Sequence, residues 1–161
     1  MLFNSLSFFF FFAALLALHY APLPWRVKKI NLLLASYFFY AAWNPPFVAL
    51  LWLSTAIDWF MAKKIAQTEE KGRRRLFLLV SVVANLGLLG YFKYGKFLLD
   101  NFTMLMHNAG IDYQPAAPDI ILPVGISFYT FQTMAYTLDV YLRRAKPADS
   151  FLSFALFVTF F

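Results

Sequence analysis

Polar and apolar positions separate onto three faces of one predicted helix, within residues 122–144. At about 100° per residue, the first face is apolar and holds Phe128, Phe131, Ala135, Leu138 and Leu142. The second holds Tyr129, Gln132, Tyr136 and Asp139, and the third holds Thr130, Thr133 and Thr137. An Asp at the middle of a membrane helix costs roughly 2.5 to 3.5 kcal/mol on insertion scales. We therefore expect both polar faces to point at other helices or at a wet cavity.

Apolar runs recur along the rest of the chain with the length of membrane helices. We predict transmembrane segments at about residues 6–22, 27–43, 47–61, 76–92 and 122–142, and an incomplete sixth at 151–161. The last has about 11 residues, some 16 Å of helix, and is too short for a ~30 Å hydrocarbon core. The predicted fold class is all-α, a multi-pass transmembrane helical bundle of five full helices plus a truncated sixth, forming part of one domain over residues 1–161.

Composition excludes an ordinary soluble domain, because 61% of the residues are hydrophobic and only 14% are charged, against about 25% charged in soluble domains. The chain has no Cys, which rules out disulfides and thiolate chemistry. No Lys or Arg precedes the first apolar segment. Since a cleavable signal peptide normally carries a basic amino end, a retained membrane helix is favoured over cleavage.

Basic residues lie in the short connections, so the net charge of +6 is interpreted as a topology signal and no nucleic acid is expected as a partner. The first, third and fifth connections hold 12 of the 14 Lys and Arg residues, and the fourth holds 2. The predicted location is therefore the bacterial inner membrane, with the amino terminus periplasmic or extracellular. In the long connection 93–120, a short helix lying on the membrane surface is expected, because Leu98, Phe102, Leu105 and Met106 oppose Asp100, Thr103 and His107.

Few residues offer obvious chemistry. His19 and His107 have no second ligand or base at useful spacing, so neither is assigned a catalytic or metal-binding role, and no metal site or phosphate-binding loop is readable. Asp58 and Asp139 lie inside apolar segments. Three interpretations stay open for Asp139: a local ion pair with Arg143 four residues later, a wall of a substrate path, or a proton relay.

The second polar face of the 122–144 helix supplies the candidate site. Tyr129, Gln132, Tyr136 and Asp139 are candidates for lining a substrate path. No charge near Gln132 or Tyr129 removes their need for a partner. Helix packing is the alternative use of the same side chains.

Three segments carry a family resemblance: LPVGISFYTFQTMAYTLDVYLRR (122–144), NLGLLGYFKYGKFLLDNF (85–102) and LLLASYFFYAAWNPPFVALLWLSTAIDW (32–59). They resemble the amino-terminal third of bacterial membrane-bound O-acyltransferases of the alginate O-acetyltransferase type. The resemblance implies a larger helix bundle that transfers an acyl group, with acetyl expected, to an exported polysaccharide such as alginate or another cell-envelope glycan.

The resemblance also implies partners and missing parts. A thioester or ester acyl donor is expected as co-substrate, with no bound cofactor, together with a polysaccharide acceptor, periplasmic or extracellular acyltransfer partner proteins and the lipid bilayer. The family's catalytic His is expected beyond residue 161, so the chain is interpreted as a fragment that is inactive alone. A transporter or flippase subunit and a non-catalytic membrane scaffold are the alternatives.

Overall fold

The computed structural model describes every residue except 1–4, 43, 113–120, 124 and 161, and the described residues form helices and no strand. The predicted all-α class is therefore confirmed. The α-helices are α1 (Leu6–Tyr20), α2 (Trp25–Ala41), α3 (Pro45–Gln67), α4 (Lys71–Leu89), α5 (Gly95–Asn108), α6 (Ile126–Tyr141) and α7 (Phe151–Thr159). A π-helical segment, η1 (Gly90–Tyr94), joins α4 to α5.

Local sequence explains several helix starts. The Ser5 hydroxyl accepts a hydrogen bond from the Phe8 amide at 3.2 Å, and the Ser150 hydroxyl accepts one from the Ser153 amide at 3.2 Å. Each satisfies an amide that has no partner inside its own helix. Pro45 and Pro46 occupy the first positions of α3, where a missing amide hydrogen costs nothing and the fixed φ suits a helix.

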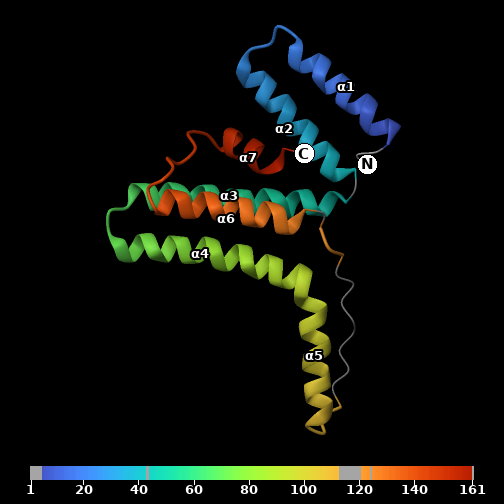
Figure 1. Ribbon diagram of the computed structural model, residues 1–161, viewed down its shortest axis with the longest axis vertical. Helices are drawn as coiled ribbons and strands as arrows, with labels where there is room; N and C mark the ends of the chain where they lie inside the picture. Colours follow the sequence, from blue (N-terminus) through green and yellow to red (C-terminus); the bar gives the residue numbers. More distant parts are fainter. Residues whose placement is uncertain (1–4, 43, 113–120, 124, 161) are drawn as a thin grey trace.

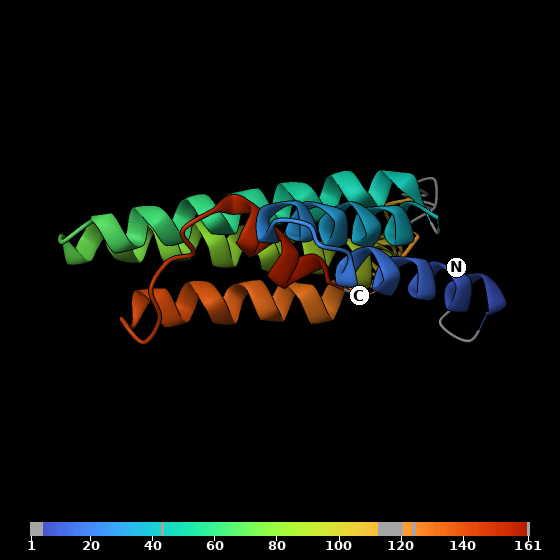
Figure 2. The same cartoon turned by 90° about the horizontal axis from the view of Figure 1, so that it is seen from above.

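The helices α3, α4 and α6 run alongside one another and form the centre of the molecule (Figures 1 and 2). The hairpin of α1 and α2 lies on one side of this centre, with α7 between it and α6 (Figure 1). α5 leaves the end of α4 and extends across the direction of the central helices (Figure 1). The main apolar core joins α3, α4, α6 and α7 and consists of Leu51, Leu89, Ile126, Tyr129, Phe154 and Val158.

Polar and charged residues make up almost half of the buried residues, and many large apolar residues are exposed. Among the described residues, 10 buried residues are polar or charged and 11 are hydrophobic, in addition to Pro123. Large apolar side chains lie outside, among them Phe128 at 74% exposure and Phe131 at 57%. Soluble monomers rarely expose such continuous apolar surface, whereas lipid makes it favourable and drives polar groups inward. Phe128, Phe131, Leu138 and Leu142 are all exposed, as the apolar face of the helix predicts.

The basic connection between the third and fourth segments is shorter than predicted. Only residues 68–70 lie outside helices there, because α3 continues to Gln67 and α4 begins at Lys71. Lys63 and Lys64 therefore extend α3 rather than forming a loop. Lysine is a good helix former, and its long side chain can carry the ammonium group to water from a helix end.

In the part of the chain that the structure describes, two helices are long and apolar enough to cross a membrane: α3, and the continuous helix from Lys71 to Asn108. α1 is a shorter apolar helix of 15 residues, and α2 and α6 have 17 and 16 residues. The helix predicted near residues 98–107 is present as α5, and its place on the membrane surface stays a prediction. It continues from α4 through η1, and π-helical turns are a known cause of sharp bends in long helices.

Candidate functional site

The helix that carries the candidate residues, α6, is bounded by two left-handed residues. It begins after Gly125, whose φ is +77°, and ends before Arg143, whose φ is 61°. Glycine adopts this conformation without steric cost, whereas a residue with a Cβ, such as Arg143, adopts it only with some strain. The predicted start at residue 122 is therefore displaced to Ile126, because the turn at Gly125 precedes the first helical residue.

The face of α6 formed by Thr130, Thr133 and Thr137, here called the threonine face, points into the bundle. All three residues are at most 1% exposed. The Thr133 hydroxyl lies 3.3 Å from Oδ1 of Asn85 on α4 and 3.1 Å from the Thr130 carbonyl oxygen, and the Thr137 hydroxyl donates to the Thr133 carbonyl at 3.1 Å. This face therefore belongs to the contact of α6 with α4 and α3.

A buried polar network, formed by Ser54, Asp58, Ser81, Asn85 and Thr133, links three helices. The Asp58 carboxylate on α3 accepts hydrogen bonds from the Ser81 hydroxyl at 2.5 Å and from the Asn85 side-chain amide at 2.8 and 2.9 Å. The Ser54 hydroxyl donates to Oδ1 of Asn85 at 3.2 Å. Because a lost partner leaves a buried group unsatisfied at about 1–3 kcal/mol, the network fixes how α3, α4 and α6 meet.

Sequence reasoning identified Asp58 but missed its partners. Ser54 and Asp58 are four residues apart on α3, and Ser81 and Asn85 are four residues apart on α4. Two polar pairs at this spacing, on consecutive apolar helices, place polar groups on one face of each helix. That pattern is the sequence feature by which the network could have been found.

The second polar face of α6 was predicted to line a substrate path, and the structure brings three of its four residues together against α7. Tyr129 is 4% exposed within the core that contains Phe154 and Val158. The Gln132 side-chain amide donates to the Phe157 carbonyl oxygen at 3.0 Å, and the Gln132 Oε1 atom is buried with no hydrogen-bond partner.

Tyr136 completes this contact, and Asp139 does not. The Tyr136 hydroxyl accepts a hydrogen bond from the Ala148 amide at 2.8 Å, and its ring centroid lies 4.4 Å from that of Phe154. Asp139 lies near the end of α6, where its carbonyl oxygen accepts from the amides of Arg144 and Ala145. We call Tyr129, Gln132 and Tyr136 the α7-facing polar face. Its role as a path wall stays a prediction.

Of the three interpretations of Asp139, the ion pair with Arg143 is wrong. The helical spacing that would join them ends at Tyr141, because Arg143 adopts the left-handed conformation. The Arg143 guanidinium instead lies 3.0 Å from the carboxylate of Glu69, a residue of the connection between α3 and α4. A pair at i and i+4 needs a continuous helix.

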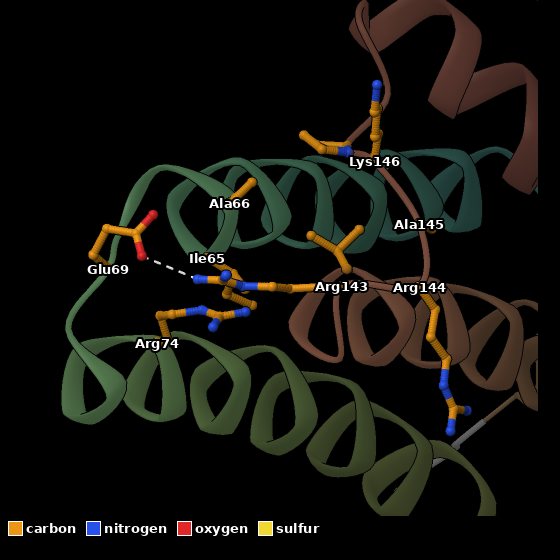
Figure 3. A pocket seen from close by; sticks show the side chains of 10 residues that line it. Ile65, Ala66, Glu69, Arg74, Arg143, Arg144, Ala145 and Lys146 are labelled. Carbon is orange, nitrogen blue, oxygen red and sulfur yellow. Dashed lines mark hydrogen bonds and ion pairs between the residues drawn. The ribbon is translucent and has the colours of Figure 1, made fainter.

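The turn after α6 and the α3–α4 connection enclose a basic pocket, a cavity of about 420 Å³. Its charged lining consists of Glu69, Arg74, Arg143, Arg144 and Lys146. Figure 3 shows Arg143 directed toward Glu69, while Arg144 and Lys146 extend in other directions. The pocket unites basic residues of the third and fifth connections, which charge counting had assigned to one side of the membrane.

The two histidines lie at helix ends. His19 is in the last turn of α1, with its ring centroid 6.0 Å from that of Tyr20 and 6.2 Å from that of Trp25. His107 is in the last turn of α5. Within the described parts of the chain, no group of three or more His, Cys, Asp or Glu residues is arranged to hold a metal ion.

The chain is similar to proteins that are named for O-acetyl transfer. The whole chain is 35% identical to a protein of Helicobacter pylori named peptidoglycan O-acetyltransferase, covering 35% of that protein. It is also 35% identical over its whole length to proteins named probable alginate O-acetylase AlgI from Pseudomonas syringae pv. tomato and Azotobacter vinelandii, covering 31% and 32% of them. The resemblance predicted from the sequence is thereby confirmed.

The chain spans about a third of the length of these curated relatives. No family model matches it, and no solved structure matches it.

Proposed function

We propose that this chain is part of a multi-pass membrane O-acyltransferase that transfers an acetyl group to an exported cell-envelope polysaccharide such as alginate. The observation that carries the proposal is the similarity, along the full chain, to relatives whose names state O-acetyl transfer to peptidoglycan or alginate. An all-helical bundle with an apolar exterior and a buried polar network is compatible with that reaction in a membrane.

The proposed membrane arrangement has α1, α2, α3, α4 and α6 crossing the bilayer and α7 entering it in part. At 1.5 Å per residue, the 23 residues of α3 extend about 34 Å, enough for a ~30 Å core. The 9 residues of α7 extend only about 14 Å. α5 would lie along the opposite interface, because it extends across the direction of the central helices (Figure 1) and exposes Phe97, Leu98 and Leu105.

The proposed orientation places the basic connections in the cytoplasm and the amino terminus in the periplasm or outside the cell. The ion pair between Glu69 and Arg143 supports this arrangement, since it joins the third and fifth connections at one end of the bundle. The hydrogen bond from Arg74 to the Tyr141 carbonyl oxygen, at 2.6 Å, does the same. These connections carry most of the Lys and Arg residues, as cytoplasmic loops do.

In the proposed reaction, a sugar hydroxyl oxygen attacks the carbonyl carbon of a thioester or ester donor. The new ester bond forms, the bond to the donor's thiol or alcohol breaks, and a general base takes the hydroxyl proton. We expect that base in another part of the whole protein, and we assign no such role to His19 or His107. The described helices would supply the scaffold, and the α7-facing polar face would border the substrate path. Acyltransfer proteins outside the membrane are expected partners.

Acetyl transfer by the whole protein tests this function. The corresponding full gene, expressed in a bacterium that lacks its own polysaccharide O-acetylation, should restore O-acetyl esters on the exported polymer, measured by proton NMR. The 161-residue chain expressed alone should not restore them. Labelled acetyl groups that cross the membrane without becoming esterified would instead indicate a transporter, and no change in either measurement would indicate a scaffold.

A further inference from the structure

We propose that the basic pocket binds a phosphate group, carried either by the headgroup of an anionic phospholipid or by a soluble phosphate ester. Four cationic residues, Arg74, Arg143, Arg144 and Lys146, line the pocket, and Glu69 is its single carboxylate. The side chain of Arg143 is directed toward Glu69, whereas those of Arg144 and Lys146 extend in other directions and leave Arg74 and Arg143 as the groups closest to a bound phosphate (Figure 3). Phosphate oxygens satisfy guanidinium groups through paired, charge-assisted hydrogen bonds. The inference concerns this pocket alone and does not depend on the proposed acetyl transfer.

Arg74, which lines the pocket, has a buried donor atom without a hydrogen-bond partner. Its Nη2 atom donates to the Tyr141 carbonyl oxygen at 2.6 Å, and its guanidinium carbon lies 5.3 Å from the centroid of the Tyr141 ring. These contacts hold the guanidinium group in place. The Nε atom of the same group is buried and has no hydrogen-bond partner. A buried donor without a partner is costly, and a phosphate oxygen would supply the acceptor.

Arg143 is held at the pocket by an uncommon backbone conformation. Its φ of 61° is left-handed, a conformation that costs a residue with a Cβ some strain and commonly ends a helix. Its partner, Glu69, is largely exposed, as is Arg143 itself, with side-chain exposures of 87% and 65%. Exposed ion pairs contribute little stability, so a phosphate group can displace Glu69 from Arg143.

The position and size of the pocket suit a ligand from either source. At about 420 Å³, it falls within the range of small-molecule sites. Ile65 and Val140 give it an apolar wall, and the charged residues lie where α3 and α6 end and α4 begins. In the proposed membrane arrangement this is the level of lipid headgroups, which is also reachable from the cytoplasm.

Two probes separate the two sources. The 161-residue chain is placed in phosphatidylcholine nanodiscs and titrated with inorganic pyrophosphate, with binding followed by calorimetry. In parallel, nanodiscs that contain phosphatidylglycerol are examined for phospholipid retained by the protein, by native mass spectrometry. Pyrophosphate binding supports a soluble ligand, and selective retention of phosphatidylglycerol without pyrophosphate binding supports a lipid ligand.

Matched variants decide whether the pocket is responsible. Arg74→Gln and Arg143→Gln should each weaken binding about tenfold, for whichever of pyrophosphate and phosphatidylglycerol the original protein binds. This is the loss expected for a charge-assisted hydrogen bond. Arg75→Gln removes the same charge from the adjacent, exposed residue, which does not line the pocket. It should change binding less than about twofold, because exposed charges act weakly at a distance.

Glu69→Gln gives a result that misfolding cannot imitate. Removing the competing carboxylate should tighten binding about two- to threefold, because the ligand then no longer has to break the weak, exposed ion pair between Glu69 and Arg143. The proposal is wrong if neither probe binds, if Arg74→Gln and Arg75→Gln weaken binding equally, or if Glu69→Gln weakens it.

Discussion

The two polar faces of α6 differ in how completely the protein satisfies them. The threonine face meets the polar network of α3 and α4, and no network side chain in the described structure has a buried polar atom without a partner. The α7-facing polar face packs against a helix of only 9 residues and leaves Gln132 Oε1 buried and unpaired. A satisfied network stabilises the bundle, whereas an unpaired buried group marks a place where another molecule or segment can bind. The threonine face is thus the structural one.

Asp58→Ala should have the largest effect on stability. The change removes the acceptor of the Ser81 hydroxyl and the Asn85 amide, and the unpaired donors should lower the free energy of unfolding by about 3 kcal/mol. Unfolding by denaturant in detergent micelles, followed by tryptophan fluorescence, measures this loss. Asp100→Ala, at an exposed position of α5, should change it by less than about 0.5 kcal/mol. Equal effects of the two variants would show that the polar network does not contribute to the free energy of unfolding more than an exposed surface residue does.

Gln132→Leu should separate function from stability. It removes one hydrogen bond to Phe157 and one unpaired buried oxygen, so the free energy of unfolding should stay within about 1 kcal/mol of its original value. Acetyl transfer by the whole protein should fall about tenfold, equivalent to about 1.4 kcal/mol of transition-state free energy. Phe128→Leu, on the exposed apolar face, is the control and should leave transfer unchanged. If Gln132→Leu lowers the stability but leaves acetyl transfer per folded molecule normal, the α7-facing polar face serves helix packing only.

Thr133→Val is the converse test on the threonine face. The variant keeps the side-chain shape but loses the hydroxyl contacts with Asn85 and with the Thr130 carbonyl oxygen, so we expect the free energy of unfolding to fall by about 1 kcal/mol. Transfer per folded molecule should not change. Thr103→Val is the control. The Thr103 hydroxyl donates to the Leu99 carbonyl oxygen within α5, so its removal should lower the free energy of unfolding by less than Thr133→Val does. A transfer defect in Thr133→Val at normal stability would contradict the division between the two faces.

Tyr136→Phe should have the smallest effect. It leaves the Ala148 amide without its acceptor, at a cost of about 0.5 to 1 kcal/mol, and the loss should be confined to the connection before α7. Hydrogen exchange at Ala148 should accelerate, whereas Tyr91→Phe, at an exposed position of η1, should leave it unchanged. Unaltered exchange in Tyr136→Phe would mean that this hydrogen bond does not hold α7 in place.

The sequence predicted what depends on periodicity. The faces of α6, the exposure of Phe128 and Phe131, and the helix within residues 93–120 all follow from repeats of 3.6 residues along a single helix. The all-α class follows from the length and frequency of apolar runs. None of these needs knowledge of which helices become neighbours.

Features that depend on tertiary structure were not predicted. The hydrogen-bond donors to Asp58 are on α4, and they can be inferred only by comparing the polar pairs of two helices, not from the residues around Asp58 alone. Arg143 pairs with Glu69 rather than Asp139, because α6 ends at Tyr141 and the left-handed conformation of Arg143 takes its side chain out of the helical spacing. The basic pocket joins residues that are about seventy positions apart in the sequence. Such contacts are set by packing between helices, which periodicity within one helix does not determine.

Labelling from the lipid phase tests the central claim most directly, that the polar faces of α6 point into protein while its apolar edge meets lipid. Single cysteines at Phe131 and Gln132, adjacent on α6, are exposed in membranes to a thiol reagent attached to an acyl chain. The arrangement predicts strong labelling at residue 131 and little at residue 132. Equal labelling of the two positions would contradict it, and with it the substrate path proposed beside α6.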